Sequence, residues 1–212
     1  MKIAHISTYD AIGGAAVAAY RLHKALQKRS VESSMVVFQK GTDDESVVEA
    51  KNEIRKMDHE EIAWGLACQE YINRRKTDPD NLLRSFPYPG CDLSAMSPIR
   101  DADIIHFHWV ARFQSPVTIN KVLQLGKPVV WTLHDQRPFT GGCHCVGACG
   151  KFVGDCSHCP QLSPESIDIT RAVLQEQRYF IRGNLHVVTP SRWLKGLATQ
   201  SVLFKELPVR HI

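Results

Sequence analysis

The chain has 212 residues, of which 43% are hydrophobic and 23% are charged, and its formal net charge is +4. This composition is that of an ordinary globular protein with a sizeable core, and it excludes a disordered, collagen-like or coiled-coil chain. Basic residues form only one short run, Asn73–Lys76, so the sequence does not indicate a partner made of nucleic acid.

The apolar runs of the sequence are short. The run Val129–Leu133 cannot span a bilayer, and the N-terminus lacks the apolar core of a signal peptide. We therefore expect a cytoplasmic protein. Peripheral attachment at the inner face of the membrane stays open, because a mild positive charge attracts anionic headgroups. Cytoplasmic thiols are reduced, which favours metal binding over disulfides for clustered cysteines.

Short apolar runs typical of buried strands alternate along the chain with amphipathic segments typical of helices. We expect strands at Lys2–Thr8, Ser33–Gln39, Ala102–Trp109, Lys127–His134, Asn184–Pro190 and Leu207–Ile212. We expect helices at Ala15–Arg29, from about residue 45 to 75 with an interruption at Gly65, at Pro116–Leu125, from about Pro164 to Phe180, and from Ser191 onward. Residues Thr77–Pro98 are predicted to form a long loop.

This alternation predicts the α/β class: a Rossmann-like domain with a mostly parallel sheet, helices on both faces and a Cys-rich loop inserted after the fourth strand. Residues 1–212 are expected to form a single domain. In such a domain ligands bind outside the carboxyl ends of the strands, so the residues that follow each strand are the candidates for a site.

Asp10, Gly13 and Gly14 follow the first strand, and the two glycines lead into a helix. The exposed N–H groups and positive dipole end of such a helix favour an anion, although a Gly-Gly pair also forms simple tight turns. The G-x-G-x-x-G fingerprint is absent and the second strand ends in Gln39-Lys40 instead of an acid. The sequence therefore does not indicate NAD.

Histidines mark the ends of the third and fourth strands. His106 and His108 are two residues apart and share a face; we interpret His106 as a hydrogen-bonded core histidine, whereas His108 fits the core and the crevice equally. His134, followed by Asp135, can donate a hydrogen bond to a substrate hydroxyl or stabilise charge at a reacting centre. Ser191 is the expected N-cap of the last helix. Four such features at one edge indicate a binding site.

The Gly-rich loop after the fourth strand contains five cysteines. Cys143, Cys149, Cys156 and Cys159 have C-x5-C-x6-C-x2-C spacing, and a tetrahedral zinc ion can fix such a loop where packing cannot. We predict structural zinc on these four thiolates. Other possible ligands are His144, Cys145 and His158, with Cys145 the first candidate for a free thiol. An iron–sulfur cluster, free thiols and a pair of disulfides remain alternatives.

Five segments of the chain, in order, are similar to the N-terminal half of bacterial family 4 glycosyltransferases. The specific part is T-L-H-D-x-x-P-F-T-G-G-C-H from Thr132, followed by C-x-x-C-P-Q-L from Cys156, which resembles the exopolysaccharide and colanic-acid branch. The other matching segments are Lys2–Leu26, Ala102–Trp109 and Val187–Leu194.

The resemblance implies the GT-B fold of two Rossmann-like domains, with this chain as the N-terminal, acceptor-side domain. It implies retaining transfer of a sugar from a UDP- or GDP-sugar to a saccharide or lipid-linked acceptor in cell-surface polysaccharide synthesis, without a catalytic metal. Gly13 and Gly14 would approach the donor diphosphate, and His134 would sit at the reacting sugar. Lower-ranked substrate contacts are Asp10, His108, Asp135 and Ser191.

In that family a second domain carries the basic residues and the E-x7-E carboxylates for the donor, and this sequence contains neither. We therefore expect the donor-binding domain to be absent and the chain to be inactive alone. The main alternative is a zinc-binding protein-interaction module without catalysis, which leaves the histidines at the sheet edge unexplained. Redox catalysis by Cys156 and Cys159 is less favoured, because their C-x2-C pair does not open a helix directly after a strand.

Overall fold

The computed structural model describes residues 1–78, 83–164 and 167–212. Within these residues the chain forms one all-parallel sheet of seven strands in the order β3-β2-β1-β4-β5-β6-β7. The strands are β1 (Lys2–Tyr9), β2 (Glu32–Gln39), β3 (Val47–Glu49), β4 (Ile104–Phe107), β5 (Val129–Thr132), β6 (Leu185–Thr189) and β7 (Val209–His211). This order contains the 3-2-1-4-5-6 arrangement of Rossmann-like folds, so the predicted class is confirmed.

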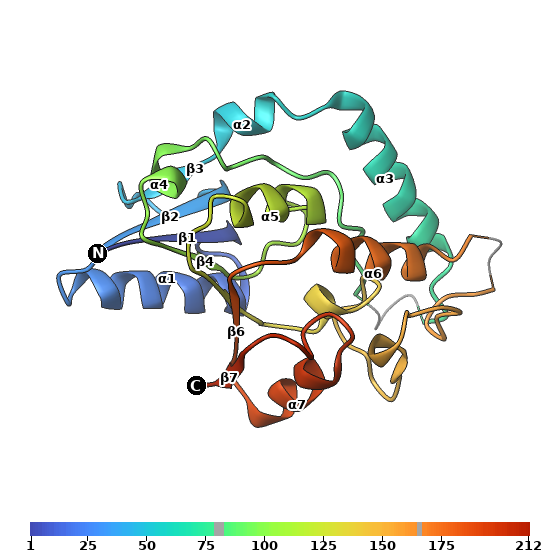
Figure 1. Ribbon diagram of the computed structural model, residues 1–212. Helices are drawn as coiled ribbons and strands as arrows, with labels where there is room; N and C mark the ends of the chain where they lie inside the picture. The colour runs from blue at the N-terminus through green and yellow to red at the C-terminus, as the bar shows by residue number, and fades with distance from the viewer. Residues whose placement is uncertain (79–82, 165–166) are drawn as a thin grey trace.

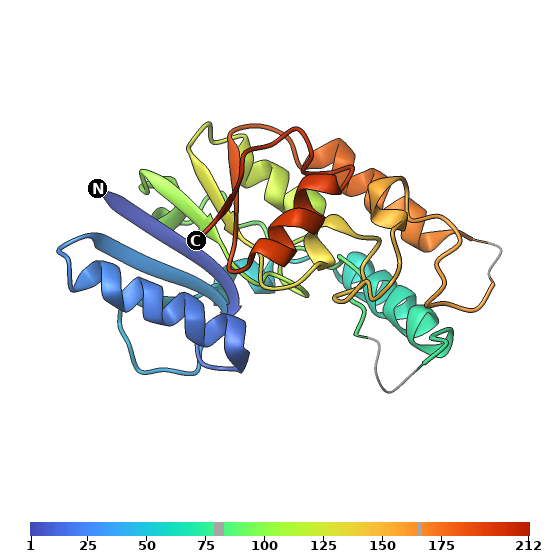
Figure 2. The same ribbon diagram turned by 90° about the horizontal axis from the view of Figure 1, so that it is seen from below.

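The helices flank this sheet (Figure 1). They are α1 (Gly13–Gln27), α2 (Lys51–Arg55), α3 (His59–Arg74), α4 (Ser97–Arg100), α5 (Pro116–Leu123), α6 (Ile169–Phe180) and α7 (Arg192–Gln200), with 3-10 turns at Arg137–Phe139 and Lys151–Val153. Figure 2 shows α1 on one side of the sheet and α5 and α6 on the other. None of the helices in the described part of the chain is long and apolar enough to cross a membrane.

The two faces of the sheet differ in how fully they are covered. On the α5 and α6 side, Phe107, Val129 and Trp131 are completely or almost completely buried in the main core. On the α1 side, Val130 and Val188 of β5 and β6 are only half-buried. Helix α1 packs on β1 and β2, and its Ala19 shares a small core with Val47 of β3. Helices therefore lie on both faces, as predicted, and the α1 side covers β5 and β6 less fully (Figure 2).

Several predicted elements differ in detail from the structure. The segment from residue 45 to 75 is not one interrupted helix, because β3 adds an edge strand and α3 runs through Gly65. Gly65 is required by close packing, since a Cβ there would lie 2.9 Å from the Tyr88 backbone. The predicted loop Thr77–Pro98 and the predicted start of α6 near Pro164 both include positions outside the described residues. Helix α6 begins at Ile169.

Candidate functional site

The carboxyl ends of β1, β4 and β5 lie side by side, because these strands are parallel and adjacent in the sheet. Strands β4 and β5 end at Phe107 and Thr132, so His108 and His134 follow just beyond the regular sheet. His5 of β1 is paired in register with His106 of β4. Three neighbouring strands thus bring four histidines to one region of the molecule.

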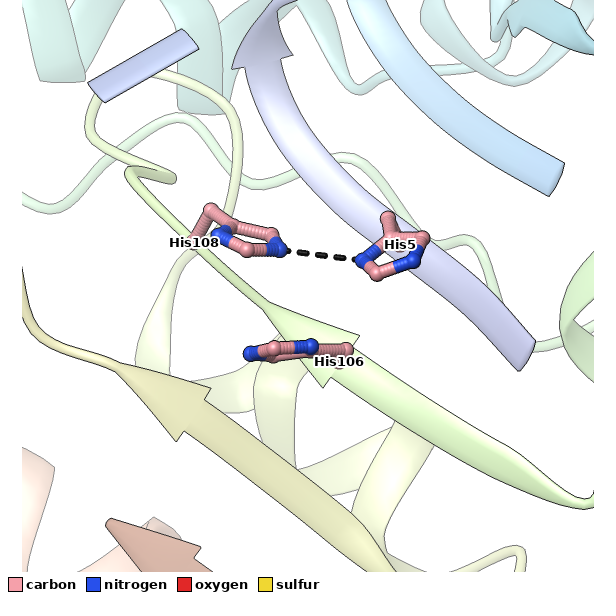
Figure 3. Close-up of side chains that lie close together, drawn as sticks. All are labelled: His5, His106 and His108. Carbon is pink, nitrogen blue, oxygen red and sulfur yellow. Dashed lines mark hydrogen bonds between the residues drawn. The ribbon is translucent and has the colours of Figure 1, made fainter. Parts of the chain in front are cut away.

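Three of these histidines form a chain of hydrogen bonds that leads from the core to the sheet edge. His5 Nδ1 lies 3.0 Å from His108 Nε2, and His108 Nδ1 lies 3.4 Å from His134 Nε2. Figure 3 shows the first of these bonds, with His106 lying alongside. His5 is fully buried, His108 is 3% exposed, and His134 is half-buried. His134 is therefore the member of this hydrogen-bond chain that a ligand can reach.

The burial of His106 and of His108 differs from what the sequence predicted. His106 is hydrogen-bonded as predicted, with its Nε2 lying 2.8 Å from Thr132 Oγ1, but it is only half-buried. His108 is the more deeply buried of the two and reaches His134 instead of an open crevice. His5 was not singled out from the sequence. Its only sequence signal is a histidine within an otherwise apolar strand.

The four histidines at this edge of the sheet are kept in the neutral state by their surroundings. Burial lowers the pKa of His5 and of His108 well below the usual histidine range, and the neighbouring histidines lower both further. Burial also lowers the pKa of His106, to about 4. Burial lowers the pKa of His134 too, although the adjacent Asp135 carboxylate opposes that shift. At neutral pH each ring therefore has one N–H donor and one acceptor nitrogen.

The buried end of this hydrogen-bond chain favours one of the two positions for the proton of His134. His5 Nε2 is buried and, among the described residues, has no hydrogen-bond partner. If His5 donates to His108 and His108 donates to His134, the unpartnered His5 nitrogen is an acceptor; in the reverse direction it is an N–H. Unpartnered buried N–H groups are the rarer case in proteins. The first direction makes His134 Nε2 the acceptor and leaves its Nδ1–H as a donor.

His5, His106 and His108 also form a group of nitrogen ligands within 4.8 Å of one another. Their rings are tilted by only 31–38° to one another, and the centroids of His106 and His108 are 4.1 Å apart. A metal ion binds the lone pair in the plane of each imidazole, and rings stacked in this way do not direct three lone pairs to one point. We therefore assign these rings to the hydrogen-bond network.

The N-terminus of α1 is open at the same edge of the sheet. The helix begins at Gly13, two residues before the predicted start, and its N-cap residue Ile12 makes no side-chain capping bond. Gly13 has a φ of +84°, which requires glycine, whereas a Cβ on Gly14 would meet no atom within 4 Å. The fold thus leaves free space beside the first N–H groups of α1, as an approaching anion needs.

Asp10 has a structural role in place of the predicted substrate contact. Its carboxylate accepts hydrogen bonds from the Gly41 N–H at 2.7 Å and from the Thr42 hydroxyl at 2.6 Å. Although burial alone would raise the pKa of Asp10, these bonds lower it below its ordinary value. The side chain is 1% exposed and joins the loop after β2 to the end of β1. It is therefore not available to a ligand in this conformation.

Asp135 is likewise held within the protein. It accepts hydrogen bonds from Trp109 Nε1 at 2.7 Å, from His144 Nδ1 at 2.6 Å and from the Arg137 N–H at 3.0 Å. Burial raises its pKa, but the bonds from His144, Trp109 and Arg137 outweigh burial and keep the carboxyl below its usual range. Asp135 thus supplies a fixed negative charge next to His134.

Ser191 is confirmed as the N-cap of α7, since its Oγ accepts a 3.1 Å hydrogen bond from the Leu194 N–H. Because this bond satisfies one of the first N–H groups of α7, that helix start is less open to an anion than the start of α1. Of the seven predicted catalytic and substrate residues, Gly13 and Gly14 are exposed and His134 is half-buried at the edge, and within the described part of the chain none of these three serves as an N-cap or makes several side-chain hydrogen bonds.

The four predicted metal ligands line one cavity beyond the carboxyl edge: Cys143, Cys149, Cys156 and Cys159. Cys145 is exposed and does not line that cavity, as expected for the spare thiol. Arg84 also lines the cavity, and the sequence did not single it out because it lies far away in the chain, within the predicted loop.

No protein-family model matches this sequence, and no curated protein is similar enough to match it.

Proposed function

We propose that this chain is the acceptor-side domain of a retaining glycosyltransferase, which transfers a sugar from a nucleotide-sugar to a hydroxyl acceptor. The observation that carries the proposal is the chain of neutral imidazoles that ends in His134, at the same sheet edge as the uncapped N-terminus of α1. The reaction class comes from the resemblance of the His134 and Cys156 motifs to family 4 glycosyltransferases.

The two features suit the two parts of a nucleotide-sugar. The first N–H groups of α1 and the positive end of its dipole suit a diphosphate, and Gly14 leaves room for one. The Nδ1–H of a neutral His134 suits a sugar hydroxyl, because a hydrogen bond to an uncharged donor orients the ring without pairing with the phosphates. A UDP- or GDP-sugar satisfies both, and the acceptor is a saccharide or a lipid-linked saccharide.

In this proposal His134 is the residue that touches the reacting sugar. His108 and His5 act through it, by fixing its ring and its tautomer. Asp135 places a negative charge next to His134, while its own oxygens are bound by His144 and Trp109. The contact with His108 orients the His134 ring, as a group that stabilises a transition state needs.

The test is titration of the ¹⁵N-labelled chain with UDP-glucose and GDP-mannose, followed by amide and imidazole chemical shifts. We expect the largest changes at Gly13, Gly14 and the His134 ring. A matched titration with free glucose 6-phosphate shows whether the α1 start binds any phosphate. Changes confined to surfaces away from Gly13, Gly14 and His134 would contradict the proposal and favour the metal-binding interaction module.

A further inference from the structure

We propose that Cys143, Cys149, Cys156 and Cys159 form a structural zinc site and that Arg84 is its buried counter-charge. The proposal does not depend on the glycosyltransferase assignment. It rests on the cavity that the four cysteines share, on the donors that point at their sulfurs, and on a buried guanidinium that has no acidic partner among the described residues.

The cavity selects four of the seven cysteines. All seven are free thiols, but only these four line the cavity, whereas Cys145 is exposed and Cys68 lies on α3. Cys143 and Cys156 are 7% and 8% exposed. The free volume enclosed is about 10 Å³, which is of the order of a single small ion or water molecule.

Two groups already donate hydrogen bonds to the sulfurs. The Gly141 N–H lies 3.3 Å from Cys156 Sγ, and Arg84 Nη1 lies 3.3 Å from Cys159 Sγ. Such donors stabilise the charged sulfur more than the thiol, and hydrogen bonds of this kind orient metal ligands. The turn that carries the C-x2-C pair is strained as well, since Cys156 and His158 have φ values of +58° and +49°. A metal on both cysteines would hold this turn.

Arg84 is a buried positive charge next to these sulfurs. It is 2% exposed, and in the described part of the chain no carboxylate lies within 4.0 Å of its guanidinium. Apart from Cys159, its partners are neutral oxygens, on Gln161 at 3.0 Å and Gly141 at 3.1 Å. A buried cation without a counter-charge is strongly destabilising. A zinc ion bound by four thiolates carries a net charge of −2, and it would therefore provide the counter-charge for Arg84.

The sulfurs are more widely spaced than the 4.8 Å grouping of His5, His106 and His108. Binding of one ion by all four sulfurs would therefore require the cysteine side chains to turn toward the cavity.

The site would fix the loop to two other parts of the chain. Cys143 forms an antiparallel bridge with Arg84, and the Cys156 carbonyl accepts a 2.7 Å hydrogen bond from Thr170 of α6. The residue after Cys143 is His144, which is bonded to both Asp135 and Ser85. Zinc would thus fix the part of the loop that contacts Asp135, the residue next to His134, without touching a substrate.

Elemental analysis of the chain, purified without chelator or added metal, tests the site. We expect about one zinc per chain, lost in Cys156→Ser and Cys159→Ser and kept in the matched controls Cys145→Ser and Cys68→Ser. We also expect Arg84→Gln to weaken zinc binding by roughly 10–100-fold, the usual effect of removing a group that supports metal ligands. Metal-free wild-type protein, stoichiometric iron, or loss of zinc in Cys145→Ser would overturn the proposal.

If the cysteine variants do not fold, wild-type protein stripped with chelator and titrated with Co²⁺ gives the answer. A tetrahedral cobalt site with four thiolates has a strong sulfur-to-metal charge-transfer band, whose intensity counts the thiolates. We expect four. A spectrum without that band, or one typical of nitrogen and oxygen ligands, would show that the cysteines do not hold the ion. Both readouts are independent of any transferase activity.

Discussion

Asp135 accepts a 2.6 Å hydrogen bond from His144 Nδ1, and this contact joins the residue after His134 to the residue after Cys143. Because an ionised carboxylate only accepts, Nδ1 of His144 carries a proton, while its Nε2 lies 2.7 Å from Ser85 Oγ. The edge of the sheet and the Cys-rich loop are therefore one connected structure. A change in the loop reaches His134 through these contacts.

In an active glycosyltransferase that contains this chain, His134→Ala should lower turnover by about 10²-fold or more, the usual effect of removing a transition-state hydrogen-bond donor. The free energy of unfolding should change by only about 1 kcal/mol, since His134 is half-buried and its one bond to His108 is long. Turnover and urea unfolding are measured together. The exposed His186→Ala on β6 is the matched control and should change neither. Wild-type turnover in His134→Ala would remove His134 from the mechanism.

The tautomer of His134 can be measured in the chain alone. We expect the ¹⁵N shifts of its ring at pH 7 to report a protonated Nδ1 and an unprotonated Nε2, because His108 donates to that nitrogen. In His108→Phe this bond is lost, and the ring should become a mixture of both tautomers. His186 serves as the internal reference for an exposed ring. A proton on Nε2 of the wild-type His134 would show that the hydrogen bonds run in the opposite direction, from His134 to His108 and on to His5.

The buried histidines make the stability of the protein sensitive to mild acid. In the unfolded chain they bind protons near pH 6.5, whereas in the folded protein their pKa values are lower, with that of His106 at about 4. The unfolded state therefore binds more protons between these values, and the free energy of unfolding falls as the pH decreases from about 6.5 toward 4. Each such histidine contributes a slope of about 1.4 kcal/mol per pH unit.

Urea unfolding at intervals between pH 7.5 and 4.5 checks this slope. His5→Phe removes one of the buried rings and should make the decline shallower by about 1.4 kcal/mol per pH unit. An unchanged slope in His5→Phe, or a stability that is constant across the range, would mean that His5 binds protons as readily in the folded protein as in the unfolded chain.

Asp10→Ala tests the structural role that the fold assigns to this carboxylate. The variant leaves the Gly41 N–H and the Thr42 hydroxyl without their acceptor, so we expect unfolding to become easier by about 1–3 kcal/mol. Asp43→Ala, an exposed carboxylate on the same loop, should change stability by less than about 0.5 kcal/mol. Equal stabilities of the two variants, together with a loss of ligand binding in Asp10→Ala, would restore Asp10 as a substrate contact.

Local patterns predicted most of the fold. Apolar runs such as the one around Val129 are short enough for strands only, and the helix that follows Gly13 has a periodicity that no strand shares, so the α/β class followed directly. Edge elements were less predictable. Strand β3 has only three residues, and its pairing with Met35 and Val37 of β2 depends on a neighbour that the local sequence does not specify.

For the candidate site, the sequence by itself determined which residue types stand at the carboxyl edge: a histidine after the strand that ends at Thr132, glycines before a helix, and a group of cysteines. Only the tertiary structure decided which of them are free to act. His5 and His108, and likewise Arg84 and Cys159, are far apart in the chain, so their contacts arise only when the strands and loops pack. The same packing places hydrogen-bond donors of the protein around the carboxylates of Asp10 and Asp135. Burial and hydrogen-bond partners are properties of three-dimensional neighbours, and those neighbours separate an accessible donor such as His134 from a structural carboxylate such as Asp10.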